Sequence, residues 1–505
     1  MLQMVGQKTT VPAPIGGWNA KDAPDLMGPA DAIALDNFFP GDSKVYLRNG
    51  HTSHATGLGN NTETLMAYDG AGTKKLFGIA GSSVFDCTSS GAVGAASVTG
   101  LSSALWGYVN MATSGGPYLW MWDETATDAP YHYNGSAWAQ PTLTGITASD
   151  VMGGMVHKRR LFVLLNNSLK FGYLAVNSIA GAVSTFDLSS LFAFGGELVA
   201  CGTWTRDGGA GADDLAVFIT SNGECAVYGG TDPSTAANWV LVGVFKIGNP
   251  IGKRCLMKVG ADLIVNTDAG VTPLSQVLQS GESAPSTAVT DKISGAFKDA
   301  AALHGSRSGW QMILYPKGKY AFVNVPVSGA GDFHQYVVNL TTGAWCRFKN
   351  QNGYSWVVHN KELYFGGSGT VFKADSGKSD NGSAIQTYGK TSFNYFESRG
   401  ISKQFTMMRP VMASNGELPV EIGFDVDFAD GITTYTASAV TGAGSAWDDA
   451  TWDSADWASE RSPIQEWRSV EGIGYCGSFR VKTSTTAQDV DWHATDILWI
   501  PAVGL

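Results

Sequence analysis

A β-hairpin unit that recurs seven times is the feature that most constrains how this chain can fold. Each unit has a short alternating apolar run and then a turn rich in glycine or asparagine, and most continue into a second apolar run. Alternation favours half-buried strands, and a turn such as Asn222-Gly223 favours a tight hairpin because its central residues must tolerate positive φ. The runs begin at Leu76, Leu119, Leu161, Leu215, Leu263, Met312 and Leu363.

The spacing between successive units is roughly 40 to 55 residues, which is the length of a four-stranded propeller blade. The sequence therefore predicts an all-β fold built on a β-propeller of about six to eight blades. The 63 glycines and the charged fraction of 15% also favour many short strands over long helices. No Trp-Asp or kelch signature accompanies the repeat, so a pair of β-sandwiches remains the alternative fold.

Composition divides the chain into three parts. Residues 1–60 are rich in proline and predict an extended N-terminal arm, which must lie on its own body or on a partner. Residues 61–375 contain the hairpin units and predict the propeller. Ser376 to Ser383 is a polar, glycine-containing linker, and the alternating runs within residues 376–505 predict an additional C-terminal antiparallel β domain.

One short helical insertion is predicted between Ser286 and Leu303. Val289, Ile293 and Phe297 recur at every fourth position, and Ser286 or Thr287 would cap the helix. Packing on a propeller edge is the simpler interpretation, and contact with a neighbouring subunit is the alternative.

The sequence predicts no catalytic, cofactor-binding or metal site. His51-x-x-His54 is half of a metal motif without a third ligand, so we expect a solvated loop. The only basic cluster, His157 to Arg160, is expected at a solvated blade edge, with weak phosphate contact as the alternative. The six cysteines are dispersed, which predicts buried free thiols in strands and no disulfide framework.

The most unusual segment runs from Trp447 to Trp457, where three tryptophans recur every five residues beside aspartates. Its spacing differs from that of an EF-hand loop. Calcium binding and carbohydrate stacking stay open as alternatives. We expect an ordered loop whose indoles pack into the C-terminal domain or into a subunit contact.

The formal net charge of −11 argues against a protein that grips nucleic acid by neutralising phosphates. A neutral or acidic wall would still let a duplex slide past. Met1 to Thr10 lack the apolar core of a signal peptide, and no apolar run is long enough to span a bilayer. We therefore expect a protein without a membrane segment that assembles in a reducing cytoplasm.

A set of short motifs is distributed over most of the chain. The motifs are Pro14 to Asn19, Asp31-Ala32, Leu35 to Pro40, Arg48 to Gly50, Arg160 to Val163, Phe186 to Leu188, Ser221 to Glu224, Val227 to Pro233, Gly248 to Gly252, Lys403-x-Phe405, Trp447-Asp448 and Trp452-Asp453. In these motifs the chain resembles the tail nozzle proteins of short-tailed phages, the tail tubular protein B class. The motifs are structural and not catalytic.

The resemblance implies a non-enzymatic structural protein of the virion tail, assembled in the host cytoplasm, through which the genome is retained and ejected. It implies a homo-oligomeric ring, a hexamer, below an adaptor ring and the portal. Further partners would be tail fibre or tail tip proteins and double-stranded DNA in transit, without a cofactor. The alternatives are a receptor- or glycan-binding tail protein and a propeller glycosidase, which would need convergent carboxylates at a funnel mouth.

Overall fold

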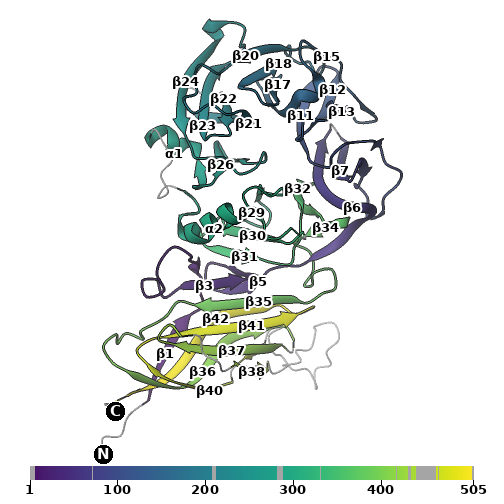
Figure 1. Ribbon diagram of the computed structural model, residues 1–505. Coiled ribbons are helices and arrows are strands. Elements are labelled where there is room, and N and C mark those ends of the chain that lie inside the picture. The colour runs from purple at the N-terminus through teal and green to yellow at the C-terminus, as the bar shows by residue number, and fades with distance from the viewer. Residues whose placement is uncertain are drawn as a thin grey trace, which may run out of the picture.

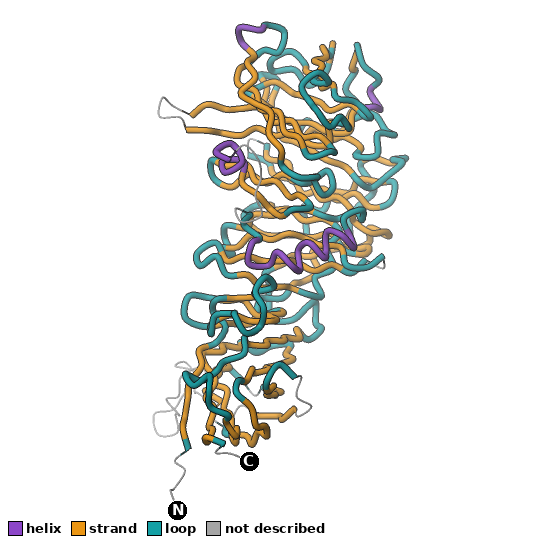
Figure 2. Tube along the Cα trace, turned by 60° about the vertical axis from the view of Figure 1, so that its left-hand side comes forward, coloured by secondary structure: helices purple, strands orange, loops and turns teal. Residues whose placement is uncertain are grey.

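The computed structural model describes residues 6–70, 72–207, 212–280, 288–329, 331–416, 418–429, 434–438, 462–464 and 466–502. These residues form a ring of small sheets and, beside it, a second body of two larger sheets (Figure 1). Figure 2 shows the two bodies stacked end to end, so the molecule is elongated.

The ring is a β-propeller whose blades follow one another in chain order. Blade 1 contains the second half of β6 (His51–Asp69), β7 (Lys74–Ala80), β8 (Ser83–Asp86) and β10 (Val98–Thr99). Blade 2 contains β11 (Trp106–Thr113), β12 (Gly116–Asp123), β13 (Tyr131–Tyr133) and β14 (Trp138–Ala139). Blade 3 contains β16 (Val151–His157), β17 (Arg160–Leu165), β18 (Lys170–Tyr173) and β20 (Ser184–Asp187).

The remaining blades complete the circle. Blade 4 contains β21 (Leu198–Asp207), β22 (Ala212–Thr220), β23 (Glu224–Gly230) and β24 (Trp239–Lys246). Blade 5 contains β25 (Leu256–Val259), β26 (Asp262–Thr267) and β27 (Gly270–Pro273). Blade 6 contains β28 (Gln311–Tyr315), β29 (Tyr320–Pro326), β30 (Phe333–Asn339) and β31 (Trp345–Phe348). Blade 7 contains β32 (Ser355–His359), β33 (Glu362–Gly366), β34 (Ser368–Ala374) and the first half of β6.

The described residues thus form a propeller of seven blades, and the predicted blade number is confirmed. Each of the seven apolar runs lies in a different blade. The ring closes through β6, which pairs with β34 in its first half and with β7 in its second. Gly57 and Gly59 have positive φ (87° and 80°) between the two halves, and glycine accepts that conformation without strain.

Aromatic side chains fill the spaces between blades. Phe171 of blade 3 stacks on Phe218 of blade 4 with ring centroids 4.3 Å apart, and Phe162 of blade 3 stacks on Trp239 of blade 4 at 5.7 Å. Such pairs add about 0.5–1.5 kcal/mol each beyond the area that they bury. The aromatic content therefore stabilises the ring without long-range strand pairing between most blades.

The second body is a β-sandwich. One sheet contains β1 (Gln7–Pro12), β4 (Phe38–Pro40), β5 (Val45–Leu47), β36 (Lys403–Ser414), β39 (Ser462–Ile464), β40 (Arg468–Gly474) and β42 (Val490–Pro501). The other contains β3 (Asp31–Asp36), β35 (Ile385–Thr391), β37 (Pro419–Val426), β38 (Thr434–Ser438) and β41 (Gly477–Thr485). Phe38, Met412, Phe479 and Trp492 are fully buried between them.

The N-terminal segment lies on its own body. β1 pairs with β42, β3 with β35, and β5 with β42, so residues 7–47 belong largely to the sandwich. β2 (Gly17–Trp18) and β3 also pair in parallel with β31 of blade 6, which makes one continuous sheet from propeller to sandwich. From His51 onward the chain is already part of blade 7.

The helical insertion is shorter than predicted. It contains the 3₁₀ turn η4 (Asp291–Ile293) and helix α2 (Ser294–His304), while the cap candidates Ser286 and Thr287 lie outside the described residues. Ile293 and Phe297 are buried as the stripe predicts. Val289 is not helical because its N–H bonds to a carbonyl of β27, which holds it at the edge of blade 5. Helix α1 (Leu274–Ser280), which follows blade 5, was not predicted.

Short strands and turns complete the connections. β9 (Gly91–Ala92) pairs with β6, and β15 (Leu143–Thr144) pairs with β19 (Gly181–Ala182). The 3₁₀ turns η1 (Ala148–Asp150) and η2 (Ala236–Asn238) precede β16 and β24.

Candidate functional site

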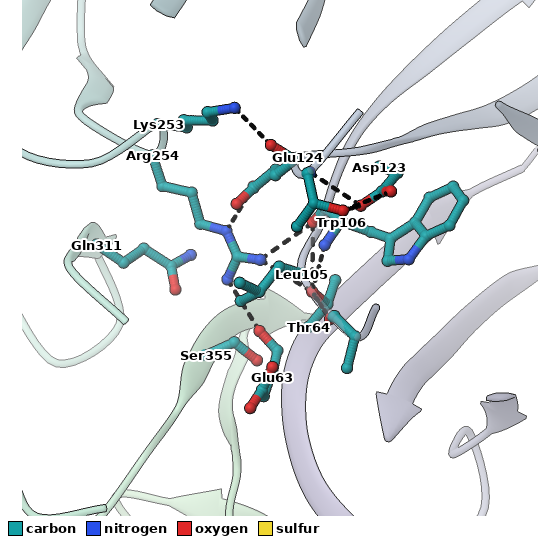
Figure 3. Close-up of polar contacts among 12 residues, drawn as sticks. Glu63, Thr64, Leu105, Trp106, Asp123, Glu124, Lys253, Arg254, Gln311 and Ser355 are labelled. Carbon is teal, nitrogen blue, oxygen red and sulfur yellow. Dashed lines mark hydrogen bonds and ion pairs between the residues drawn. The ribbon is translucent and has the colours of Figure 1, made fainter. Parts of the chain in front are cut away.

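Two polar centres stand out, and the first lies at the propeller axis. A cavity of about 220 Å³ there is crossed by Arg254, which reaches from the loop before β25 towards blades 1 and 2 (Figure 3). Its Nε donates to Glu124 Oε1 at 2.9 Å and its Nη1 to the carbonyl of Glu63 at 3.1 Å. Its Nη2 donates to Thr64 Oγ1 at 2.9 Å and to the carbonyl of Trp106 at 3.1 Å.

Lys253 strengthens this crossing. Its ammonium donates to the carbonyl of Glu124 and lies 3.7 Å from the sulfur of Met152. Burial raises the pKa of Glu63, while the neighbouring Arg254 opposes that rise. The two cations therefore fasten blade 5 to blades 1 and 2 across the centre of the ring.

Asp123 is the other carboxylate drawn at this centre, and it organises a loop. Burial opposes its ionisation, but the N–H and hydroxyl of Thr125 and the hydroxyl of Ser103 hold the pKa of Asp123 below its usual value. Its carboxylate oxygens accept hydrogen bonds from backbone N–H groups of the loop that follows β12. Glu124 is likewise committed to Arg254, so these two carboxylates make bracing contacts at the axis.

The second centre is the junction between blade 6 and the sandwich. The carboxylate of Asp36 on β3 accepts two hydrogen bonds from Arg347 on β31, at 2.7 and 3.0 Å. Lys349 Nζ lies 2.6 Å from the same carboxylate. Burial and these two cations lower the pKa of the adjacent His334 to about 4. A bidentate arginine–carboxylate pair fixes orientation as well as distance, so the two bodies are held in one geometry.

A buried ion pair lies beside it. The Arg48 side chain is 1% exposed and its two Nη atoms donate to the two oxygens of Asp380 at 2.8 and 2.7 Å. His51 Nδ1 lies 3.2 Å from the same carboxylate. Although burial opposes ionisation, hydrogen bonds from His51 and Arg48 hold the pKa of Asp380 below its usual value.

Asn37 and Gly50 lie in the same junction, where the first adopts a positive φ and the second leaves no room for a side chain. Asn37 has φ 56°, and its side-chain oxygen accepts from Arg48 Nε and from the N–H of Lys349, both at 2.8 Å. Its amide donates to the carbonyl of Gln386 on β35 at 2.8 Å. A Cβ on Gly50 would stand 1.9 Å from the carbonyl oxygen of Ser379, so only glycine fits.

Of the histidine pair singled out in the sequence, His51 lies in the second centre, beside Asp380. His51 and His54 are on strand β6 and not in a solvated loop, so that expectation was wrong. His51 is buried between Phe365 and Phe372, and His54 Nε2 lies 3.0 Å from the carbonyl of Cys87. Within the described ranges, no group of three or more His, Cys, Asp or Glu could hold a metal ion.

The basic cluster forms the turn between β16 and β17. His157 and Arg160 are buried at the strand ends, so the expectation of a fully solvated cluster was wrong for these two. Lys158 and Arg159 occupy the turn with φ of 44° and 65°. Arg160 lies 3.4 Å from Asp232 and over the ring of Tyr173.

The remaining sequence expectations concern thiols and tryptophans. Five of the six cysteines are buried, Cys201 is partly buried, and all are free thiols. Trp447 to Trp457 lie outside the described residues. Sequence reasoning did not identify Arg254, and the only signal for the junction was that Asp36, Asn37 and Arg48 belong to the family-like motifs.

Comparisons with known proteins identify no family for this chain. No family model and no curated protein matches the chain. A Myceliophteria thermophila Cps50 (Swd1) β-propeller domain is 13% identical with a TM-score of 0.37, covering 60% of this chain and 93% of that one. An exo-β-1,3-galactanase from Phanerochaete chrysosporium with β-1,3-galactotriose is 10% identical with a TM-score of 0.29, covering 90% and 99%.

BBS1N in complex with ARL6DN is 16% identical with a TM-score of 0.28, covering 41% of this chain and 62% of that one. The match therefore spans less than two thirds of that protein. The propeller assignment rests on the strand pairing of this chain itself. No helix in the described ranges has the length and apolar character needed to cross a bilayer.

Proposed function

We propose that this chain is a non-enzymatic structural subunit of a phage tail, of the nozzle class, that assembles into a ring through which DNA passes. The observation that carries the proposal is where the family-like motifs lie. Asp36, Asn37 and Arg48 of the N-terminal motifs join blade 6 to the sandwich through buried, charge-assisted contacts. A nozzle subunit has to keep its two bodies in one orientation under load, and such contacts provide that stiffness.

The polar centre at the axis supports a bracing role as well. All four contacts of the Arg254 guanidinium end on groups of the propeller itself. The cavity of about 220 Å³ that it crosses is smaller than a typical pocket for one drug-sized ligand, so it is far too small to hold a DNA duplex. In this proposal the DNA path therefore lies between copies of the chain and not through the propeller.

The net charge of −11 agrees with a conduit that does not retain DNA. Tight phosphate contacts would resist sliding, and their affinity would fall steeply with salt. We expect duplex binding by the assembled protein to be weaker than micromolar near physiological salt. Sub-micromolar binding would indicate a clamp and contradict the conduit.

The adaptor ring and the tail fibre or tip proteins are the partners in this proposal, and the virion tail is its location. Electron cryomicroscopy of purified virions, with the chain located by a specific Fab, tests it directly. Density on the tail axis in a cyclic ring is the expected result. A position that projects outward would indicate the receptor- or glycan-binding alternative, and absence from the virion would refute the proposal.

A further inference from the structure

A cavity of about 360 Å³, which we call the junction cavity, lies between blade 6 and the sandwich, and Arg48 is part of its lining. Its other lining residues come from β4, β5, β29 and β31, from the turn between β28 and β29, and from the residues that follow β5, β31 and β34. Pockets that hold small ligands have volumes of about 300–1,000 Å³, and this cavity falls within that range. The cavity at the axis, of about 220 Å³, falls below it.

Four aromatic rings line the junction cavity. Phe39, Tyr320 and Phe348 contact one another with ring centroids 5.9 to 6.3 Å apart. Tyr46 packs on Phe39 at 5.3 Å and is 36% exposed, so part of its ring is open to solvent. The face of an aromatic ring carries partial negative charge and attracts weakly positive C–H groups. This lining therefore suits a ring-shaped ligand with C–H groups on its faces.

Two buried polar side chains of the lining lack a hydrogen-bond partner in the protein. Gln351 is 4% exposed and Tyr320 is 8% exposed. Among the described residues, none forms a hydrogen bond with the side-chain amide of Gln351 or with the hydroxyl of Tyr320. Buried amides and phenols normally have such a partner. Because both side chains line the cavity, their polar groups can bind only to water or to a ligand that enters it.

The charges around the cavity disfavour an anion. All five N–H donors of Arg48 are bonded within the protein, and Asp380 neutralises its charge. Asp375 adds a negative charge to the lining, and Asn49 Nδ2 orients it by donating to its Oδ1 at 2.8 Å. Lys319 is exposed and forms no ion pair with any described residue. The lining thus offers hydrogen-bond donors and acceptors without a surplus of positive charge.

We propose that the junction cavity binds a hexose. Sugar hydroxyls both donate and accept, so one ligand can satisfy the amide of Gln351, the hydroxyl of Tyr320 and the carboxylate of Asp375. Its ring C–H groups would lie against the aromatic lining. A purely apolar ligand would leave the polar groups unpaired, and an inorganic anion would be repelled by Asp375. The inference goes beyond the proposed tail role, because the whole lining comes from a single chain.

Saturation-transfer difference NMR of the full-length chain tests the proposal. The probes are glucose, galactose and mannose, each as the free hexose and as its methyl glycoside. At least one of the three should bind. Binding of the free hexose alone would identify a free monosaccharide as the ligand, and binding of the methyl glycoside would identify the end of a glycan. Both results support a hexose site.

Two variants locate the binding in the cavity. Gln351→Leu removes the amide at similar volume, and Tyr320→Phe removes only the hydroxyl. Each should weaken sugar binding by about tenfold, because one hydrogen bond to the ligand is lost. Neither should lower the melting temperature, because the removed group has no partner in the protein. Should thermal unfolding show that one variant is not folded, the other carries the test.

The matched controls make the same substitutions at exposed positions. Gln404→Leu lies on β36, and Tyr475→Phe lies between β40 and β41. Neither residue lines the junction cavity. Both controls should bind the sugar as the wild type does.

Three results would overturn the proposal. The first is that no probe binds at millimolar concentration, and the second is sugar binding that neither cavity variant weakens. The third is binding of inorganic sulfate without binding of any sugar, which would assign the cavity to an anion. The location of the chain in the virion is measured separately, so the tail proposal can stand when this one fails.

Discussion

Replacing Arg48 by methionine should lower the free energy of unfolding by about 3 to 5 kcal/mol. The Arg48 side chain is 1% exposed, and its two Nη atoms hold both oxygens of Asp380. Methionine fills much of the same volume but leaves that carboxylate buried with only His51 nearby. The cost is that of an unpaired buried charge and not that of one hydrogen bond, which would be about 1 kcal/mol.

The double variant Arg48→Met with Asp380→Leu separates these two costs. Removing both charges leaves no buried ion, so part of the lost stability should return, and the two changes should couple by about 1 to 3 kcal/mol. Lys74→Met serves as the matched control because its partner Asp69 is exposed and the pair spans one hairpin. That change should cost less than about 1 kcal/mol.

Urea denaturation followed by tryptophan fluorescence and by far-ultraviolet circular dichroism measures these values. The midpoint should fall for Arg48→Met at an unchanged slope, because the surface exposed on unfolding is the same. A loss below about 1 kcal/mol, or a double variant as unstable as the sum of its singles, would refute the account of the junction given above. Transitions that differ between the two probes would mean that the two bodies unfold separately.

Three further predictions concern backbone space, the axis and pH. Gly50→Ala should sharply lower the melting temperature, since its Cβ would meet the carbonyl of Ser379, whereas Gly94→Ala, with open space around it, should not. Arg254→Met should lower the melting temperature by several degrees and leave ring assembly unchanged, as thermal unfolding and mass photometry would show. The pKa of His334 is about 4 when folded, against 6.5 as its ordinary value, so the unfolded chain takes up the proton first. Stability should therefore fall as pH drops from 6.5 to 4, and His334→Gln should flatten that slope in denaturation at several pH values.

The blades could be predicted because a β-hairpin is a local structure. Alternation and turn chemistry are encoded within about ten residues, so each run indicated a strand pair without knowledge of the rest of the chain. The spacing of the runs then set the number of blades. The start of the helix was predicted less well. The apolar pattern included Val289, but the backbone N–H of Val289 donates a hydrogen bond to β27, so this residue lies outside the helix.

The pairing of distant segments could not be predicted in this way. β1 pairs with β42 across nearly the full length of the chain, and β2 pairs in parallel with β31. Neither pair of strands is joined by a short turn, so turn residues give no signal for the pairing. A proline-rich opening segment predicted only that an arm must lie on something, and the choice of its own sandwich depends on complementary edges that local patterns do not encode.

The contacts in the polar centres could not be predicted from local sequence patterns either. The motif Arg48 to Gly50 was noticed, but its partner Asp380 follows 332 positions later, and no spacing rule connects them. His51 and His54 were assigned to a loop, but on the strand they pack against Phe365 and Tyr364, which are successive residues of β33 and point to opposite faces, so the two histidines cannot share a ligand. The strand β6 therefore removes even the half of a metal site that the spacing offered.

Net charge is a sum, and the fold decides how that sum is distributed. A value of −11 predicts weak affinity for phosphate, and it says nothing about where the remaining cations gather. In a propeller the direction of each strand fixes the face on which each turn emerges. The lysines of blades 6 and 7, separated along the sequence, thereby reach one face, while Asp268 and Asp332 reach the other. Ion pairs at the turns, such as Arg160 with Asp232 and Lys317 with Glu362, then decide how much of that charge remains, so the net charge alone does not predict the sign of either face.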